Sequence, residues 1–131
     1  MVNLSNWQAM SNSILIVDDN TTIRRSLHRL LEARSGWEVC GEAANGREGI
    51  EKAERLKPDV VVMDMSMPEM DGIAAAKILK SQMPTLPIIM FTNFADDQFL
   101  KQEVLDAGIR HVVSKSDSQA LVLAVESVFR A

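Results

Sequence analysis

Short apolar runs alternate along the chain with longer segments in which apolar residues recur every three or four positions. The runs predict buried strands because they are rich in β-branched residues and too short for helices. They cover residues 14–18, 37–43, 59–63, 87–91 and 111–114. The longer segments predict helices because their spacing places apolar side chains on one face. They cover residues 20–34, 47–56, 72–83, 96–107 and 117–130.

Strict alternation of strands and helices predicts an α/β fold with a five-stranded parallel sheet covered by helices on both faces. In such sheets, ligands bind beyond the carboxyl ends of the strands. The residues that directly follow each strand are therefore the candidates for chemistry.

Composition narrows the class of protein. The 131 residues fit one domain, which we place at residues 12–131, after a polar leader at residues 1–11. A net charge of −4 argues against direct binding to nucleic acid. The single cysteine, Cys40, cannot form an internal disulfide, and no apolar run approaches the ~20 residues of a membrane span. These features predict a cytoplasmic domain.

The strand ends carry a distinctive set of side chains: Asp18, Asp19, Asp64, Thr92 and Lys115. Crowded carboxylates repel one another unless a cation joins them, and an incomplete cage of oxygen ligands suits Mg²⁺. The chain has no glycine-rich phosphate loop, so we expect a single phosphoryl group rather than a nucleotide. One carboxylate would attack phosphorus, while the lysine and threonine would hold the phosphoryl oxygens.

Each of these residues alone also has a structural interpretation. An aspartate after a strand often caps the next helix, which fits Asp19 and fits Asp71 better still. Thr92 alone would be another cap, and Lys115 alone a solvated lysine. Four strand ends that converge on one chemistry favour the functional interpretation of the set.

The sequence resembles the receiver domain of two-component response regulators from about residue 12 to residue 131. The resemblance is carried by "VDDN" (17–20), "MDMSMPEMDG" (63–72), "FTN" (91–93) and "VVSK" (112–115), in that order and spacing. The segment from residue 38 to 72 is most similar to the NarL/FixJ type, whose receivers usually precede a DNA-binding domain that the printed chain does not contain.

The resemblance implies a doubly wound, flavodoxin-like fold in which a sensor histidine kinase or phosphotransfer protein donates a phosphoryl group to an aspartate. By position, Asp64 would be the phosphorylated residue. Asp18 and Asp19 would form the acidic pair that supports Mg²⁺, with Asp19, Asp64 and the backbone carbonyl of Ser66 as direct ligands. Thr92 and Lys115 would complete the catalytic set.

The same resemblance implies that phosphorylation switches a partner-binding surface. The partner would be an output domain that controls transcription, or a second receiver in a homodimer, on the face made by helix 96–107, strand 111–114 and helix 117–130. In the last helix, a step of ~100° per residue spreads the apolar side chains over an arc of ~160°. The excess edge, Val122 and Phe129, has no obvious cover. It is either a wide margin of the core or part of this interface, and the resemblance favours the interface.

Three positions depart from the family pattern, and one of them is Ser116, which follows Lys115 where many members have proline. Val112 stands where members usually have an aromatic switch residue, and Phe94 places a large apolar side chain two residues after Thr92.

Other functions remain as alternatives. One is a free-standing, single-domain response regulator, and another is a binding module that works without phosphate. The third is a phosphatase or phosphotransferase with similar strand-end aspartates. Such enzymes typically need a second aspartate two residues after the nucleophile, where this chain has Ser66. We therefore expect no enzyme activity beyond self-phosphorylation and dephosphorylation.

Overall fold

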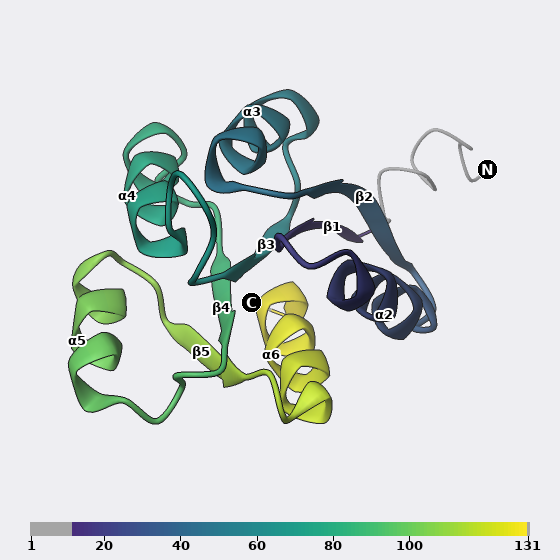
Figure 1. Ribbon diagram of the computed structural model, residues 1–131. Coiled ribbons are helices and arrows are strands. Elements are labelled where there is room, and N and C mark those ends of the chain that lie inside the picture. The colour runs from purple at the N-terminus through teal and green to yellow at the C-terminus, as the bar shows by residue number, and fades with distance from the viewer. Residues whose placement is uncertain (1–11, 131) are drawn as a thin grey trace.

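The computed structural model describes residues 12–130 (Figure 1), so the predicted leader at residues 1–11 lies outside the described residues. The strands are β1 (Asn12–Val17), β2 (Trp37–Ala43), β3 (Val60–Asp64), β4 (Ile88–Thr92) and β5 (His111–Ser114). The helices are α2 (Thr21–Glu32), α3 (Gly46–Leu56), α4 (Gly72–Gln82), α5 (Gln98–Asp106) and α6 (Ser118–Arg130). Each predicted strand and helix is confirmed.

The strands form one parallel sheet in the order β2-β1-β3-β4-β5. The chain steps outward from β1 to β2, and then crosses back to β3 on the other side of β1. The order of the strands therefore reverses between β1 and β3, and a crevice opens beyond the carboxyl ends of strands at such a reversal. The predicted doubly wound, flavodoxin-like fold is confirmed.

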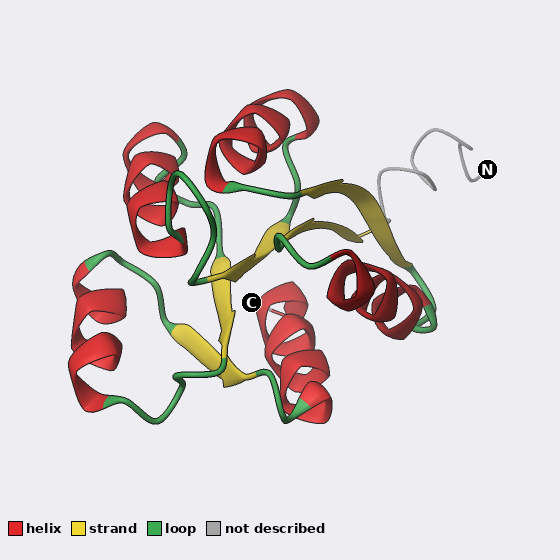
Figure 2. Ribbon diagram, viewed as in Figure 1, coloured by secondary structure: helices red, strands yellow, loops and turns green. Residues whose placement is uncertain are grey.

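Helices lie on both faces of the sheet (Figure 2), and a hydrophobic cluster fills the space between the sheet and the helices on each face. Helices α3, α4 and α5 cover one face, over a core that includes Val61, Met63 and Leu79. Helices α2 and α6 cover the other face, over a core that includes Ile16 and Leu121. All of β3 is buried because both faces of this central strand are covered, which explains its continuous apolar sequence.

Side-chain caps set where several helices begin. Asn20 accepts a hydrogen bond from the backbone N–H of Ile23 at 3.0 Å and caps α2, so the interpretation of Asp19 as the cap of this helix is wrong. The start of α5 was predicted two residues too early. Asp97 caps this helix by accepting from the N–H groups of Phe99 and Leu100, at 2.9 and 3.2 Å.

None of the helices within residues 12–130 is both long enough and apolar enough to cross a membrane.

The expectation for the last helix was wrong. Val122 is buried, and Phe129 packs edge-to-face on Trp37 with ring centroids 5.3 Å apart and an interplanar angle of 84°. Trp37 opens β2, at the sheet edge remote from β5, so helical periodicity could not reveal this cover. The exposed apolar side chain of α6 is Leu123 instead.

We expect Phe129→Ser to lower the free energy of unfolding by about 2 kcal/mol or more, because it removes the ring that packs on Trp37. Leu123→Ser, on the same helix but 56% exposed, should change it by only about 0.5 kcal/mol. Urea denaturation followed by circular dichroism measures both. Equal losses in the two variants would contradict the packing role of Phe129.

Candidate functional site

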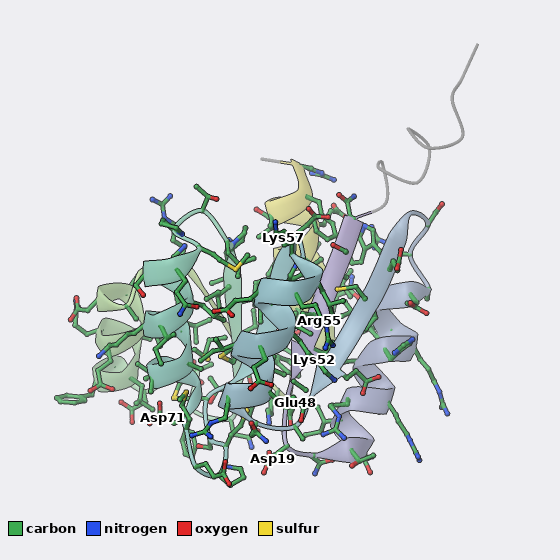
Figure 3. All side chains as sticks on the ribbon, turned by 90° about the horizontal axis from the view of Figure 1, so that it is seen from above. Asp19, Glu48, Lys52, Arg55, Lys57 and Asp71 are labelled. Atoms are coloured by element: carbon green, nitrogen blue, oxygen red, sulfur yellow. The ribbon has the colours of Figure 1, made fainter. Side chains whose placement is uncertain are left out.

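The predicted chemistry gathers at the carboxyl edge of the sheet. Asp18 directly follows β1, Asp64 ends β3, Thr92 ends β4 and Lys115 directly follows β5. Because the strands are parallel, these side chains meet at one edge. Figure 3 shows Asp19 at this edge together with Asp71, at the end of the molecule opposite Lys57.

The three strand-end aspartates form one cluster. Asp18, Asp19 and Asp64 each offer a carboxylate oxygen, and these atoms lie within 4.8 Å of one another. Asp18 and Asp64 are buried, whereas Asp19 is exposed. The cluster therefore has a buried floor and an open side towards solvent.

Lys115 joins two of the carboxylates. Its Nζ lies 3.0 Å from Asp18 Oδ2 and 3.1 Å from Asp64 Oδ1, and all three side chains are largely buried. Asp18 Oδ2 has the Lys115 ammonium as its ion-pair partner and no further hydrogen-bond donor within the described part of the chain. A buried carboxylate oxygen in this state is short of partners.

Burial and crowding shift the ionisation of this cluster. Burial, followed by the charge of Asp18, raises the pKa of the Asp64 carboxyl, and the opposing contacts from Lys115 do not cancel the rise. For Lys115, burial lowers the pKa of the ammonium, but the contacts with Asp18 and Asp64 outweigh this effect and raise it overall. Lys115 thus stays charged. Its positive charge does not fully offset the unfavourable effect of burial and of the Asp18 charge on ionised Asp64.

The donor set fits a divalent cation. Three carboxylates against one ammonium leave two negative charges at the site when all are ionised, which is the charge that one Mg²⁺ would balance. The ligand atoms are hard oxygens, and Asp18 Oδ2 lacks a hydrogen bond. Asp18, Asp19 and Asp64 are thus the residues that could hold such an ion.

Ser66 and Thr92 border the cluster. The Ser66 N–H points at Asp64 Oδ1 across 3.4 Å, a long contact that places the Ser66 backbone beside the carboxylate. Thr92 is buried, and its hydroxyl accepts a hydrogen bond from the Phe94 N–H at 3.1 Å. This bond closes a local turn. The alternative of Thr92 as a helix cap is wrong because Asp97 caps α5.

The loop after β3 explains the "MDG" at its end. The Gly72 N–H donates to the Met65 carbonyl at 2.7 Å, so α4 starts directly against the end of β3. A Cβ at Gly72 would lie 2.1 Å from the Asp64 carbonyl oxygen, which excludes any larger residue without a backbone shift. Asp71 caps α4 by accepting from the Ala74 N–H at 2.8 Å, as predicted.

Sequence reasoning missed a polar chain behind the acidic cluster. Arg24 Nη1 donates to the Asp18 carbonyl at 2.6 Å, and its Nε pairs with Glu42 at 3.2 Å. Glu42 also contacts His28 Nδ1 at 3.0 Å, and this contact raises the pKa of the imidazole. Glu42 lies on β2 and Arg24 on α2, and neither residue type is unusual at its position, so the sequence carried no signal for the pair.

The sequence of this chain is similar to known receiver domains and response regulators. The family model described as the response regulator receiver domain matches residues 14–126. Over 102 residues, the chain is 44% identical to a protein-glutamate methylesterase/protein-glutamine glutaminase of Alkalilimnicola ehrlichii, covering 77% of this chain and 26% of that protein. Over 109 residues, it is 38% identical to the response regulator protein VraR of Staphylococcus aureus, covering 83% of this chain and 52% of VraR.

Solved structures agree with these matches. A LuxR-family two-component response regulator from Aurantimonas sp. SI85-9A1 superposes with a TM-score of 0.86 and 31% identity, over 92% of this chain and 86% of that one. The response regulator domain of Thermotoga maritima CheB gives the same TM-score with 25% identity, over 92% and 98% of the two chains. The chain thus spans about a quarter to a half of the curated relatives above, but most of each structural relative.

We expect Asp64→Asn to raise the melting temperature at pH 7 when divalent cations are removed by EDTA. The raised pKa of Asp64 means that this carboxyl stabilises the fold fully below its ordinary value of 3.8, and that this stability is lost as the pH rises through the folded-state pKa. Asparagine has the shape of the protonated carboxyl and keeps its neutrality at every pH.

Thermal melts between pH 4 and pH 8 test this expectation. The gap between variant and wild type should narrow as the pH falls. Asp96→Asn removes an exposed carboxylate from the β4–α5 loop and should leave the melting temperature nearly unchanged. A lower melting temperature for Asp64→Asn at pH 7 would show that ionised Asp64 is stabilising.

Proposed function

The chain belongs to the response regulator receiver domain family of two-component systems, and on this premise we propose that Asp64 is its phosphorylation site. The observation that carries the proposal is the position of this buried carboxylate at the end of β3, 3.1 Å from the Lys115 ammonium and inside the aspartate cluster. The donor is the phosphohistidine of a sensor histidine kinase or phosphotransfer protein.

The transfer step uses residues of this chain in distinct roles. An oxygen of Asp64 attacks phosphorus, the bond from phosphorus to the donor's imidazole nitrogen breaks, and that nitrogen keeps the electron pair. Lys115 neutralises charge on the phosphoryl oxygens and needs little movement because it already contacts Asp64. The Thr92 hydroxyl, at the end of the neighbouring strand β4, donates to another phosphoryl oxygen.

We propose Mg²⁺ as the cation of the cluster, held by Asp18, Asp19, Asp64 and the backbone carbonyl of Ser66. When bound, the ion offsets the negative charge that accumulates during phosphoryl transfer. Asp18 serves two partners in this arrangement, because its Oδ2 also faces Lys115. The chain catalyses only its own phosphorylation and dephosphorylation and forms no external product.

The output of the receiver is a change in partner binding. We place the partner surface on the face made by α5, β5 and α6, where a second receiver or an output domain binds. Leu105 on α5 and Leu123 on α6 support this assignment, since each is 56% exposed. Val112 on β5 packs against the core under α3–α5, so it replaces the usual aromatic ring with a smaller contact. We propose control of transcription in the cytoplasm as the output, and the likeness to a LuxR-family two-component response regulator supports the signalling role on which this proposal rests.

Phosphoramidate with Mg²⁺ should add one phosphate to the wild-type protein, and Asp64→Asn should remain unmodified because it lacks the attacking carboxylate. Asp71→Asn is the matched control: it alters the same loop, keeps a side chain that caps α4, and should still gain one phosphate. Intact-mass spectrometry reads all three proteins. A phosphate on Asp64→Asn would refute the assignment.

Millimolar Mg²⁺ should raise the melting temperature of the wild type, because binding stabilises the fold by about 1.4 kcal/mol at ten times the dissociation constant. Asp19→Asn should reduce this rise. Asp19 is exposed and makes no ion pair within residues 12–130, so the substitution removes a ligand without breaking a contact. Differential scanning fluorimetry with Asp96→Asn as control measures the rise, and an undiminished rise in Asp19→Asn would exclude that carboxylate as a ligand.

A further inference from the structure

A groove of about 420 Å³ lies between α4 and α5, beside the aspartate cluster. It is formed by the β3–α4 loop, the first turn of α4, the β4–α5 loop and the first two turns of α5. Its lining residues are Met65, Ser66, Asp71, Ile73, Phe94, Asp97, Phe99, Leu100 and Glu103.

Two phenylalanines of the groove are exposed. Phe94 is 52% exposed and Phe99 is 76% exposed, although the chain has only four phenylalanines. Beneath them, Met65 is buried, and Ile73 and Leu100 are partly buried against the core. Aromatic side chains on an apolar floor are typical of the centre of a protein interface.

The backbone that carries these rings is held in place. The Phe94 N–H donates to Thr92 Oγ1 at 3.1 Å, and its carbonyl accepts from the Asp97 N–H at 3.1 Å. The Phe99 N–H donates to Asp97 Oδ1 at 2.9 Å. A partner that docks here meets a rim whose backbone is already ordered, which lowers the entropic cost of binding.

The charge of the groove selects the partner. Asp71, Asp97 and Glu103 are its charged lining residues, and the nearest lysines on the same helices, Lys77 and Lys101, do not line it. The caps use Oδ1 of Asp71 and Asp97, so neither cap uses the Oδ2 atom of its aspartate. An acidic rim repels phosphates of nucleic acids and anionic lipids. Two copies of the groove would also repel each other in a chain of net charge −4.

We propose that this groove, with Phe94 and Phe99 on its rim, docks a cationic segment of a partner protein. The segment inserts one or two large apolar side chains between the phenylalanines, and its lysines or arginines face Asp71, Asp97 and Glu103. This surface lies on the α4 side of α5 and is distinct from the α5–β5–α6 face. It does not require phosphorylation of Asp64, so it can be tested without a phosphodonor.

The probe is a phage library of random 12-residue peptides. Selection is on the wild-type protein in EDTA, with counter-selection on the double variant Phe94→Ser/Phe99→Ser. We expect the recovered peptides to combine a large apolar residue with flanking lysines or arginines. Recovery of no peptide that distinguishes wild type from the double variant, or recovery of peptides without basic residues, would overturn the proposal.

A recovered peptide with a fluorescent label then tests the contacts by anisotropy. Phe99→Ser should weaken binding about tenfold or more, as for an interface hot spot. Glu103→Lys should weaken it several-fold and should improve binding of the same peptide with its lysines changed to glutamates, a charge exchange that loss of folding cannot produce. Leu123→Ser is the matched control, an exposed leucine on α6, and should bind as the wild type does.

Two outcomes count against the proposal at this stage. An equal loss in Leu123→Ser would show that binding is not specific to the groove. Sedimentation velocity tests the other occupant: self-association of the wild type that disappears in Phe99→Ser would make the groove an interface between two copies. Failure of either kind leaves the phosphorylation experiment on Asp64 unaffected, because that experiment uses a different variant and readout.

Discussion

One lysine ammonium holds the strand ends of this molecule together electrostatically. Lys115 reaches from the end of β5 to carboxylates at the ends of β3 and β1. In the sheet, β4 lies between β5 and β3, and β1 lies beyond β3. A single positive charge cannot balance three neighbouring aspartates, so the site keeps a deficit of positive charge. Burial, followed by the charge of Asp18, raises the pKa of Asp64 in spite of Lys115. That deficit makes the site receptive both to a divalent cation and to a group that changes the charge of Asp64. The excess of carboxylates over ammonium groups lowers the stability of the free domain, and the same excess favours binding of a cation at the site.

The rest of the fold holds these crowded carboxylates in place in spite of their mutual repulsion. Two hydrophobic layers cover the sheet, and β3 is buried along its whole length up to Asp64. Gly72 lets α4 begin against the end of the same strand, and Asp71 caps that helix. The backbone on each side of Asp64 is therefore fixed by packing and hydrogen bonds that do not depend on the ionisation of its carboxyl. Changes of charge at the site can act on side chains and loops without unfolding the strand.

The sequence predicted what depends on local pattern and failed where distant residues meet. Apolar runs and helical spacing were sufficient for the strands and helices, and strand-end positions brought Asp18, Asp64 and Lys115 together, because parallel topology converts sequence position into proximity. The packing of Phe129 on Trp37 could not be predicted from the sequence, because this contact joins the last helix to the second strand. The contact of Arg24 with Glu42 was hidden for the same reason. The late start of α5 reflects competition between two aspartates, of which Asp97 rather than Asp96 caps the helix.

A single hydrogen bond connects the proposed phosphorylation site to the proposed docking groove. Thr92 Oγ1 accepts from the Phe94 N–H, and this bond helps to set the turn that presents the Phe94 ring. In the proposed transfer step this hydroxyl would rotate to donate to a phosphoryl oxygen, which would move its lone pairs and remove part of the support of the turn. Phe99 is anchored separately by the Asp97 cap and does not share this bond. Under the two proposals, the Phe94 side of the groove would respond to the state of Asp64 and the Phe99 side would not, so the groove would bind its partner in both states with different affinity.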